Sequence, residues 1–359
     1  MSDFLKNFLQ TDIRALAAKS PGKVYVAAFG KHPGWNDHID NLGLETKTLV
    51  VADQLIYLEG IASQIDAGVW DRLGEGSLYP AFGHLLLWHR PGEAIIGVIA
   101  SSRDGKGRTR YPLIVCAHVV GLPIERVVRE VGPVVEAAMK ECRSVETAGA
   151  VRAILERARQ QLAEVIGRHP AGGPGQAEPR PLGGAGPSEG QLRILYEIKN
   201  KLAAWAPVRS GAKESAARER GVHMRLDPHG GSVAEALLYW TTFLHSQLDG
   251  SAPLLFMSPL DAGWVDVIVG KPAAADFFVL KAGIKAVPMV SSVPYEMGDA
   301  FRSSARNVFG EISKGTSSEL TIFGPRVNSG PSGMGVGGAA FWKQPWQRLR
   351  ASWGKGGSG

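Results

Sequence analysis

Long apolar runs are missing from this sequence, and no segment approaches the roughly 20 residues that a membrane-spanning helix needs. Cysteine is scarce as well. Cys116 and Cys142 form no C-x-x-C pair, which excludes a disulfide framework and a cysteine-based zinc site. Asp3 and Asp12 interrupt the N-terminal segment, so it lacks the layout of a secretory signal peptide. These absences lead us to expect a cytoplasmic protein.

The common catalytic and nucleotide-binding signatures are also missing. The sequence has no G-x-S-x-G, no H-E-x-x-H and no G-x-x-x-x-G-K-[ST]. Residues 333–338 satisfy G-x-G-x-x-G formally, but they lie in a glycine- and serine-rich tail and open no helix after a strand. No catalytic signature therefore stands out in the sequence, and we predict no cofactor.

Acidic residues are absent from residues 324–359, and five of the six net positive charges lie there. The rest of the chain is therefore close to neutral. A neutral chain with a basic tail is a poor match to a nucleic-acid-binding groove, so we predict no nucleic-acid partner. The basic residues of the tail are Arg326, Lys343, Arg348, Arg350 and Lys355.

Two apolar, β-branched runs stand out at residues 95–99 and 113–120, joined by a polar segment at residues 101–110. Continuous apolar runs of this length are typical of strands that are buried on both faces. Gly105 and Gly107 permit a turn between them. The pattern predicts the central hairpin of a helix-covered sheet, with a basic turn at one end.

The remaining periodicities predict an α/β protein: a mixed β-sheet with helices packed on its faces. Residues 1–167 form its N-terminal part, and residues 191–323 complete the same fold or form a second subdomain. Residues 168–190 hold five prolines and seven glycines and are predicted to be a disordered linker, as is the tail at 324–359. Helices are predicted over residues 4–17, 46–65, 124–140, 145–166, 192–205, 232–248, 273–281 and 295–312. Strands are predicted over residues 24–29, 84–88, 254–257, 265–269 and 287–293, with a brief extended piece at 320–323.

Two histidines and two carboxylates lie within the nine-residue loop 32–40. Imidazole and carboxylate groups are good ligands for zinc, iron or manganese, so a metal-dependent hydrolase is one interpretation. The other is a connecting loop whose Asn and Asp side chains accept backbone N–H bonds in turns. The spacing matches no known ligand pattern, and we keep the metal site as the alternative. Its ligands would be His32, Asp37, His38 and Asp40.

The turn at residues 104–110 also has more than one interpretation. Its glycine N–H groups and its arginines could cradle a phosphate. A solvated hairpin turn is the commoner case. Between these lies a third hypothesis, in which Asp104 or Asp37 pairs with Arg108 and fixes two loops at one edge of the sheet.

The C-terminal segment carries large apolar residues at spacings of four, three and four, which would place them on one helical face. Pro345 fits the start of such a helix. The face could lie in a membrane interface, dock in a partner's groove, or pack against its own domain. Its residues are Trp342, Trp346, Leu349 and Trp353.

Two further motifs lie about seventy residues apart. The first is Gly30-Lys31-His32-Pro33 followed by Asp37, and the second is Ser102-Arg103-Asp104 with Gly107-Arg108 leading into Tyr111-Pro112-Leu113. They resemble the motifs G-K-x-P-x-x-G-D-F and S-x-D-x-x-G-R-x-[FY]-P-L of the type VI secretion-associated TagF/ImpM family. Asn36-Asp37-His38 replaces Gly-Asp-Phe, and one extra residue separates Arg108 from Tyr111.

The resemblance implies a cytoplasmic, non-enzymatic accessory protein of a type VI secretion apparatus. Such proteins are regarded as regulators of assembly that act by binding another component, often near a forkhead-associated protein and a kinase/phosphatase pair. We expect a protein component of the apparatus as partner, with a forkhead-associated protein as one candidate and peripheral membrane contact through the tail as another. The residues expected to fix the binding loops are Gly30, Lys31, Pro33, Asp37, Ser102, Asp104, Gly107, Arg108, Arg110, Tyr111 and Pro112.

Overall fold

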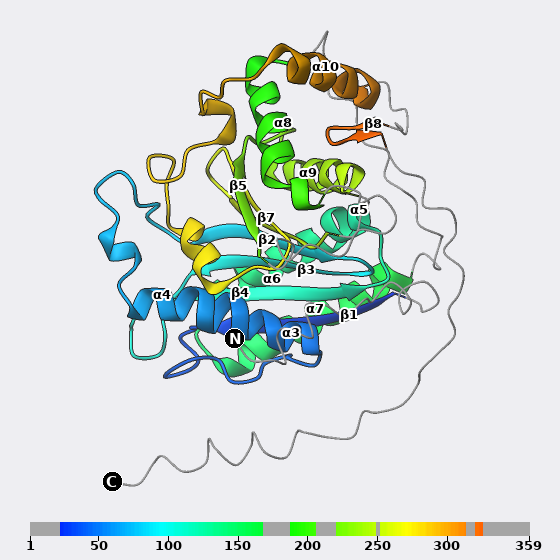
Figure 1. Cartoon of the computed structure of the whole chain (residues 1–359). Coiled ribbons are helices and arrows are strands. Elements are labelled where there is room, and N and C mark those ends of the chain that lie inside the picture. Colours follow the sequence, from blue (N-terminus) through cyan, green and yellow to red (C-terminus); the bar gives the residue numbers. More distant parts are fainter. Residues whose placement is uncertain (1–21, 168–186, 206–219, 249–251, 314–319, 326–359) are drawn as a thin grey trace, which may run out of the picture. The chain divides into compact units, whose positions relative to one another are not determined.

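The computed structural model describes residues 22–167, 187–205, 220–248, 252–313 and 320–325. Within them, seven strands form one sheet in the order β1-β4-β3-β2-β6-β7-β5 (Figure 1). The predicted helix at 4–17, the linker residues 168–186 and the tail residues 326–359 lie outside the described residues. The strands are β1 (Lys23–Gly30), β2 (Gly83–Arg90), β3 (Glu93–Ser101), β4 (Pro112–Val120), β5 (Val222–Leu226), β6 (Leu254–Pro259) and β7 (Val265–Val269).

The predicted central hairpin is confirmed. β3 pairs with β4 from Glu93 opposite Val120 to Ser101 opposite Pro112. Every residue of β3 except Ser101 is buried. This follows from the apolar runs, because a strand covered on both faces has no position at which a polar side chain reaches water.

Helices cover both faces of the sheet, which confirms the α/β class, but the sheet is antiparallel throughout rather than mixed. β1 and β2 could have formed a parallel pair only if the helical connection between them had placed β2 beside β1. Instead β4 and β3 stand between them, and the short turn between β2 and β3 makes those two strands antiparallel neighbours.

The C-terminal half adds strands to the same sheet. β6 pairs with β2 from His84 opposite Pro259 to His89 opposite Leu254, so residues 191–323 extend the sheet of the N-terminal half. β5 was not predicted. The strand predicted at residues 287–293 is wrong, because that segment holds only the 3-10 turn η7 (Val290–Ser292) and pairs with no strand.

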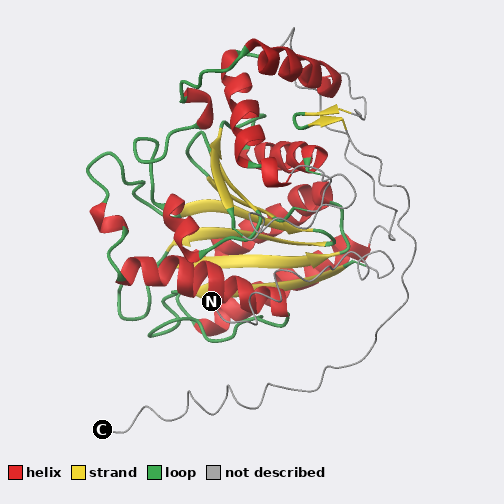
Figure 2. Cartoon of the chain, in the orientation of Figure 1, coloured by secondary structure: helices red, strands yellow, loops and turns green. Residues whose placement is uncertain are grey.

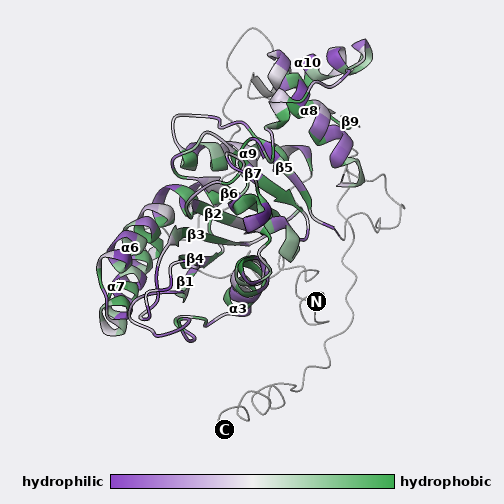
Figure 3. Cartoon of the chain, turned by 90° about the vertical axis from the view of Figure 1, so that its left-hand side faces the viewer, coloured by the Kyte–Doolittle hydropathy of each residue, from purple (hydrophilic) through white to green (hydrophobic). Residues whose placement is uncertain are grey.

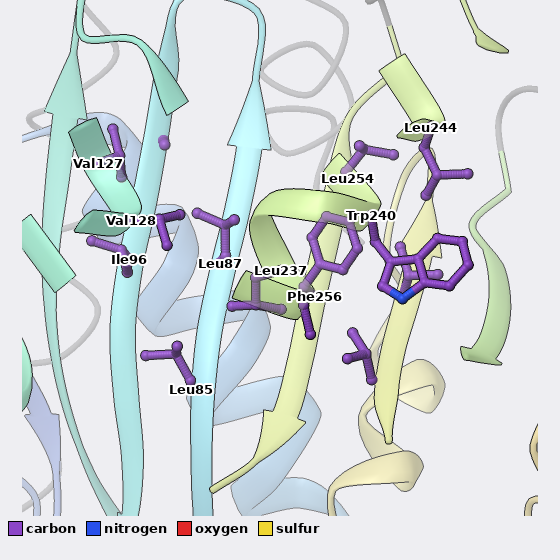
Figure 4. Close-up of a cluster of buried hydrophobic side chains, with 14 of the residues drawn as sticks. Leu85, Leu87, Ile96, Val127, Val128, Leu237, Trp240, Leu244, Leu254 and Phe256 are labelled. Atoms are coloured by element: carbon purple, nitrogen blue, oxygen red, sulfur yellow. The ribbon is translucent and has the colours of Figure 1, made fainter. Parts of the chain in front are cut away.

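One face of the sheet lies under α5 (Ile124–Arg126), the π-helical η3 (Val127–Val131), α6 (Gly132–Ser144), α7 (Ala148–Gly167) and α9 (Val233–Gln247). Figure 3 shows α6 and α7 beside β1 to β4, and Figure 4 shows part of this core. There Leu85, Leu87 and Ile96 from β2 and β3, with Leu254 and Phe256 from β6, meet Val127, Val128, Leu237, Trp240 and Leu244 from the helices. Ser232 caps α9 as predicted, accepting the backbone N–H of Glu235.

The opposite face lies under the helix predicted at residues 46–65. In the structure this helix consists of α3 (Lys47–Ala52), the π-helical η1 (Asp53–Ala62) and α4 (Ser63–Asp66). The 3-10 helices η2 (Trp70–Arg72) and η6 (Ala274–Leu280) cover the same face. Figure 2 shows the resulting order of helix, sheet and helix. The two faces hold separate apolar clusters.

The remaining described elements are α8 (Glu189–Lys201), η4 (Ala203–Trp205), α10 (Asp299–Ser313), β8 (Leu320–Thr321) and β9 (Gly324–Pro325). α8 and α10 pack together through Tyr196 and Phe301, whose ring centroids are 5.0 Å apart. Arg302 also pairs with Glu189 across them at 2.7 Å. Within the described residues, no helix is both long enough and apolar enough to cross a membrane.

Candidate functional site

Both family-like motifs lie at one edge of the sheet. β1 ends at Gly30 and β3 ends at Ser101, while β4 begins at Pro112. The antiparallel register sets Gly30 opposite Leu113 and Ser101 opposite Pro112. The loops 31–40 and 102–111 therefore leave the sheet side by side, although about seventy residues separate them in sequence.

Gly30 turns the first loop back over the sheet. Its φ of 103° lies in the region that favours glycine, and a Cβ atom there would lie 2.3 Å from the carbonyl oxygen of Pro112. The N–H of Lys31 donates to that same oxygen at 3.0 Å, and the N–H of Ile39 donates to the carbonyl of Gly30 at 2.8 Å. Gly30 thereby fixes both ends of the loop.

The substitution Gly30→Ala is expected to remove about 2–4 kcal/mol from the free energy of unfolding, because it adds backbone strain and a clash with Pro112. Urea unfolding followed by circular dichroism measures this change. Gly74→Ala is the matched control, since a Cβ atom there meets nothing within 4 Å. Equal unfolding midpoints for the two variants would contradict the role given to Gly30.

Asp104 is the centre of the second loop, and its side chain is buried. One carboxylate oxygen accepts the backbone N–H groups of Lys106 and Arg108, each at 3.0 Å. The other accepts Nε of Arg108 at 2.6 Å and lies 3.5 Å from Nζ of Lys31. Burial acts to raise the pKa of Asp104, but the hydrogen bonds from Arg108 and Lys106 outweigh it and lower the pKa to about 2.

This arrangement argues against a phosphate cradle in the turn at residues 104–110. The N–H groups that would hold an external anion already bind the carboxylate of Asp104. Gly107, with φ of 80°, allows the chain to close around that carboxylate. The turn therefore carries its own anion.

Arg108 joins the two loops. Its Nη2 donates to the carbonyl oxygen of Asn36 at 3.2 Å and to a carboxylate oxygen of Asp37 at 3.3 Å. The same oxygen of Asp37 also accepts Nζ of Lys31, whose side chain is buried. The hypothesis that Asp104 or Asp37 pairs with Arg108 is thus confirmed, and the structure shows both pairs. We call Lys31, Asp37, Asp104 and Arg108 the rim network.

Backbone contacts reinforce the rim network. The N–H of Gly105 donates to the carbonyl of Trp35 at 2.7 Å. A Cβ atom at position 105 would lie 2.8 Å from Oδ1 of Asn36 and 3.0 Å from the carbonyl oxygen of Pro33. The two loops are therefore in direct contact, and glycine at position 105 permits their close approach.

Two other motif residues, Arg110 and Tyr111, bond to side chains of η2 and α4. Arg110 pairs with Asp71 at 2.9 Å, and the Tyr111 hydroxyl donates to Asp66. Nζ of Lys31 also lies 5.2 Å from the centre of the Tyr111 ring. Ser102 makes only a 3.4 Å hydrogen bond to the carbonyl of Arg103 and does not join the rim network.

The residues of the alternative metal site do not converge. Nδ1 of His32 accepts the N–H of Gly34 at 3.0 Å, so Nε2 carries the proton that is donated to the carbonyl of Cys142 at 2.8 Å. Nδ1 of His38 instead lies 2.8 Å from the hydroxyl of Tyr57. Among the residues that the structure describes, no three His, Cys, Asp or Glu side chains are placed to hold a metal ion.

Sequence reasoning missed a depression beside the rim network, with a volume of about 400 Å³. One wall comes from the two loops and the other from the connection between α6 and α7, so no local motif could have revealed it. Its lining residues are His32, Pro33, Ser101, Ser102, Arg103, Thr109, Arg143, Ser144, Val145 and Glu146.

No protein-family model matches the sequence, and no curated protein does. Among solved structures, the chain is similar to the crystal structure of PA0076 from Pseudomonas aeruginosa PAO1. The sequences are 17% identical, the match covers 77% of this chain and 99% of that chain, and the TM-score is 0.37.

Proposed function

We propose that this protein is a non-enzymatic accessory protein of a type VI secretion system, resident in the cytoplasm, that regulates assembly by binding another protein component. The binding surface is the edge of the sheet formed by loops 31–40 and 102–111. The resemblance of the two motifs to the TagF/ImpM family supports the secretion context, and the geometry of the rim network supports binding.

The observation that carries the proposal is the position of Arg108 between the carboxylates of both loops. The four side chains of the rim network bond to one another and none of them lines the depression, so we assign them the role of holding a surface in shape. Arg108 and Asp37 keep 47% and 65% of their side chains exposed. The outer part of the rim network is therefore accessible to a protein partner, while Lys31 and Asp104 stay buried beneath it.

A photo-cross-linking amino acid at position 106 tests the proposal, because Lys106 is exposed at the tip of the second loop. In cells that produce the secretion apparatus, we expect irradiation to give a covalent adduct with one of its components, identified by mass spectrometry. The double variant Asp37→Asn with Arg108→Gln should reduce the adduct at least tenfold, since it removes the exposed ion pair that joins the two loops.

The matched control is an ion pair of similar exposure on the helices α6 and α7. Glu141 and Arg157 pair there with 49% and 51% of their side chains exposed. The double variant Glu141→Gln with Arg157→Gln should leave the adduct unchanged. Loss of the adduct in both double variants, or no adduct from position 106, would overturn the proposal.

A further inference from the structure

The turn that closes the rim network exposes an excess of positive charge. Residues 103–110 contain four basic side chains and a single acid, Asp104. That acid is buried, and its carboxylate is taken up by Arg108, Lys31 and the backbone of the turn. Lys106, Arg108 and Arg110 are exposed. Arg108 and Arg110 pair with the exposed carboxylates of Asp37 and Asp71, so Lys106 carries the excess positive charge on the outer surface of this loop.

Two arginines line the depression beside the rim network. They are Arg143, in the last turn of α6, and Arg103, in the loop 102–111. Arg143 is exposed, and no carboxylate of the described chain lies within ion-pair distance of it. The hydroxyl-bearing residues Ser102, Thr109 and Ser144 also line the depression.

Glu146 places a carboxylate on Arg103 in the free protein, with Nη2 and Oε1 2.5 Å apart. Both side chains are largely exposed, at 55% for Arg103 and 70% for Glu146. An exposed pair of this kind contributes only about 0–1 kcal/mol, so a carboxylate from another molecule can replace it. Glu146 thus marks the position that an external carboxylate would take.

We propose that this depression receives an acidic segment of the protein partner, whose carboxylates bind Arg103 and Arg143 and displace Glu146. The proposal rests on the proposed function, in which this edge of the sheet binds a protein. A nucleic acid is a poorer fit, because it requires a continuous row of cations along its backbone. Here Glu146 and Asp37 interrupt the positive surface.

The probe is a fluorescein-labelled peptide of ten glutamates, titrated with the full-length protein at 50 mM NaCl and followed by fluorescence anisotropy. Arg143→Glu should weaken binding at least tenfold, because it removes one cation and adds a repelling charge. Glu146→Gln should tighten binding about threefold, because it frees Arg103. A variant that gains affinity cannot be explained by loss of fold.

Lys47→Glu is the matched control, since it makes the same change of charge at an exposed site on α3, on the opposite face of the sheet (Figure 3). It should leave the dissociation constant within twofold. Equal weakening by Arg143→Glu and Lys47→Glu would show a general charge effect and overturn the proposal, as would a Glu146→Gln variant without tighter binding. Decauridine bound as tightly as the peptide, with the same response to Arg143→Glu, would overturn it in favour of nucleic acid.

The cross-linking experiment separates this proposal from the proposed function. If the peptide does not bind at the depression but the adduct from position 106 forms, the acidic segment is ruled out and the protein partner stands. If Arg143→Glu weakens both the peptide and the adduct while Lys47→Glu weakens neither, both proposals are supported.

Discussion

The variant Asp104→Asn is expected to lose about 2–4 kcal/mol of unfolding free energy, the largest loss from a single atom replacement at the edge that carries the rim network. The amide keeps the size of the side chain but removes its charge, and its NH₂ group turns a donor toward Arg108 or toward the N–H groups of the turn. Lys31 then stays buried with only the exposed Asp37 as a counter-charge. Guanidinium chloride unfolding measures the loss.

The pH dependence of this loss gives an independent check. The pKa of Asp104 is about 2 in the folded chain against an ordinary value of 3.8, so the unfolded chain binds the extra proton first as the pH falls. The carboxylate therefore contributes fully above about pH 4, and its contribution disappears toward pH 2. The difference between the wild type and Asp104→Asn should shrink across that window. A difference that stays constant down to pH 2 would contradict this assignment.

The second large effect is expected at Arg225, a fully buried side chain of β5. Its Nε and Nη2 donate to the two oxygens of Asp266 at 2.9 and 2.8 Å, and Nη1 donates to the carbonyl of Val287 at 3.0 Å. Arg225→Met should lose about 3–5 kcal/mol, because Asp266 would remain buried without a counter-charge of equal strength. The thermal unfolding midpoint and the denaturant midpoint both report this loss.

The double variant Arg225→Met with Asp266→Leu is the control for charge against packing. Replacing both members of a buried pair by apolar side chains is often close to neutral, so this variant should regain at least half of the loss. His223 and Trp264, which also bond to Asp266, would lose a partner and limit the recovery. If the double variant is no more stable than Arg225→Met, the loss comes from packing and the electrostatic explanation fails.

Much of the fold was predictable because burial dictates composition. The runs at 95–99 and 113–120 could only be strands covered on both faces, and the structure buries them there. β5 escaped prediction because Arg225 makes Val222–Leu226 resemble a surface segment. Only the fold shows that Asp266 of β7 lies opposite Arg225 and neutralises it. The direction of strand pairing was equally hidden, since an apolar run does not specify it.

The candidate site divides in the same way. The Asp37–Arg108 pairing could be predicted, because both loops follow the ends of strands. The first loop offers the carboxylate of Asp37, and the second is rich in arginine and lysine. The depression could not, because Arg143 and Glu146 come from the connection between two helices. His32 resembled a metal ligand in the sequence, whereas its ring is used to hold the carbonyl of Cys142 at the end of α6.

The most direct test of the joined loops is a double-mutant cycle on Lys31→Met and Asp104→Asn, with the free energy of unfolding as the readout. Lys31 belongs to the first loop and Asp104 to the second, and both side chains are buried 3.5 Å apart. We expect a coupling energy of about 1–3 kcal/mol. A coupling below about 0.5 kcal/mol would mean that the two loops do not act as one surface.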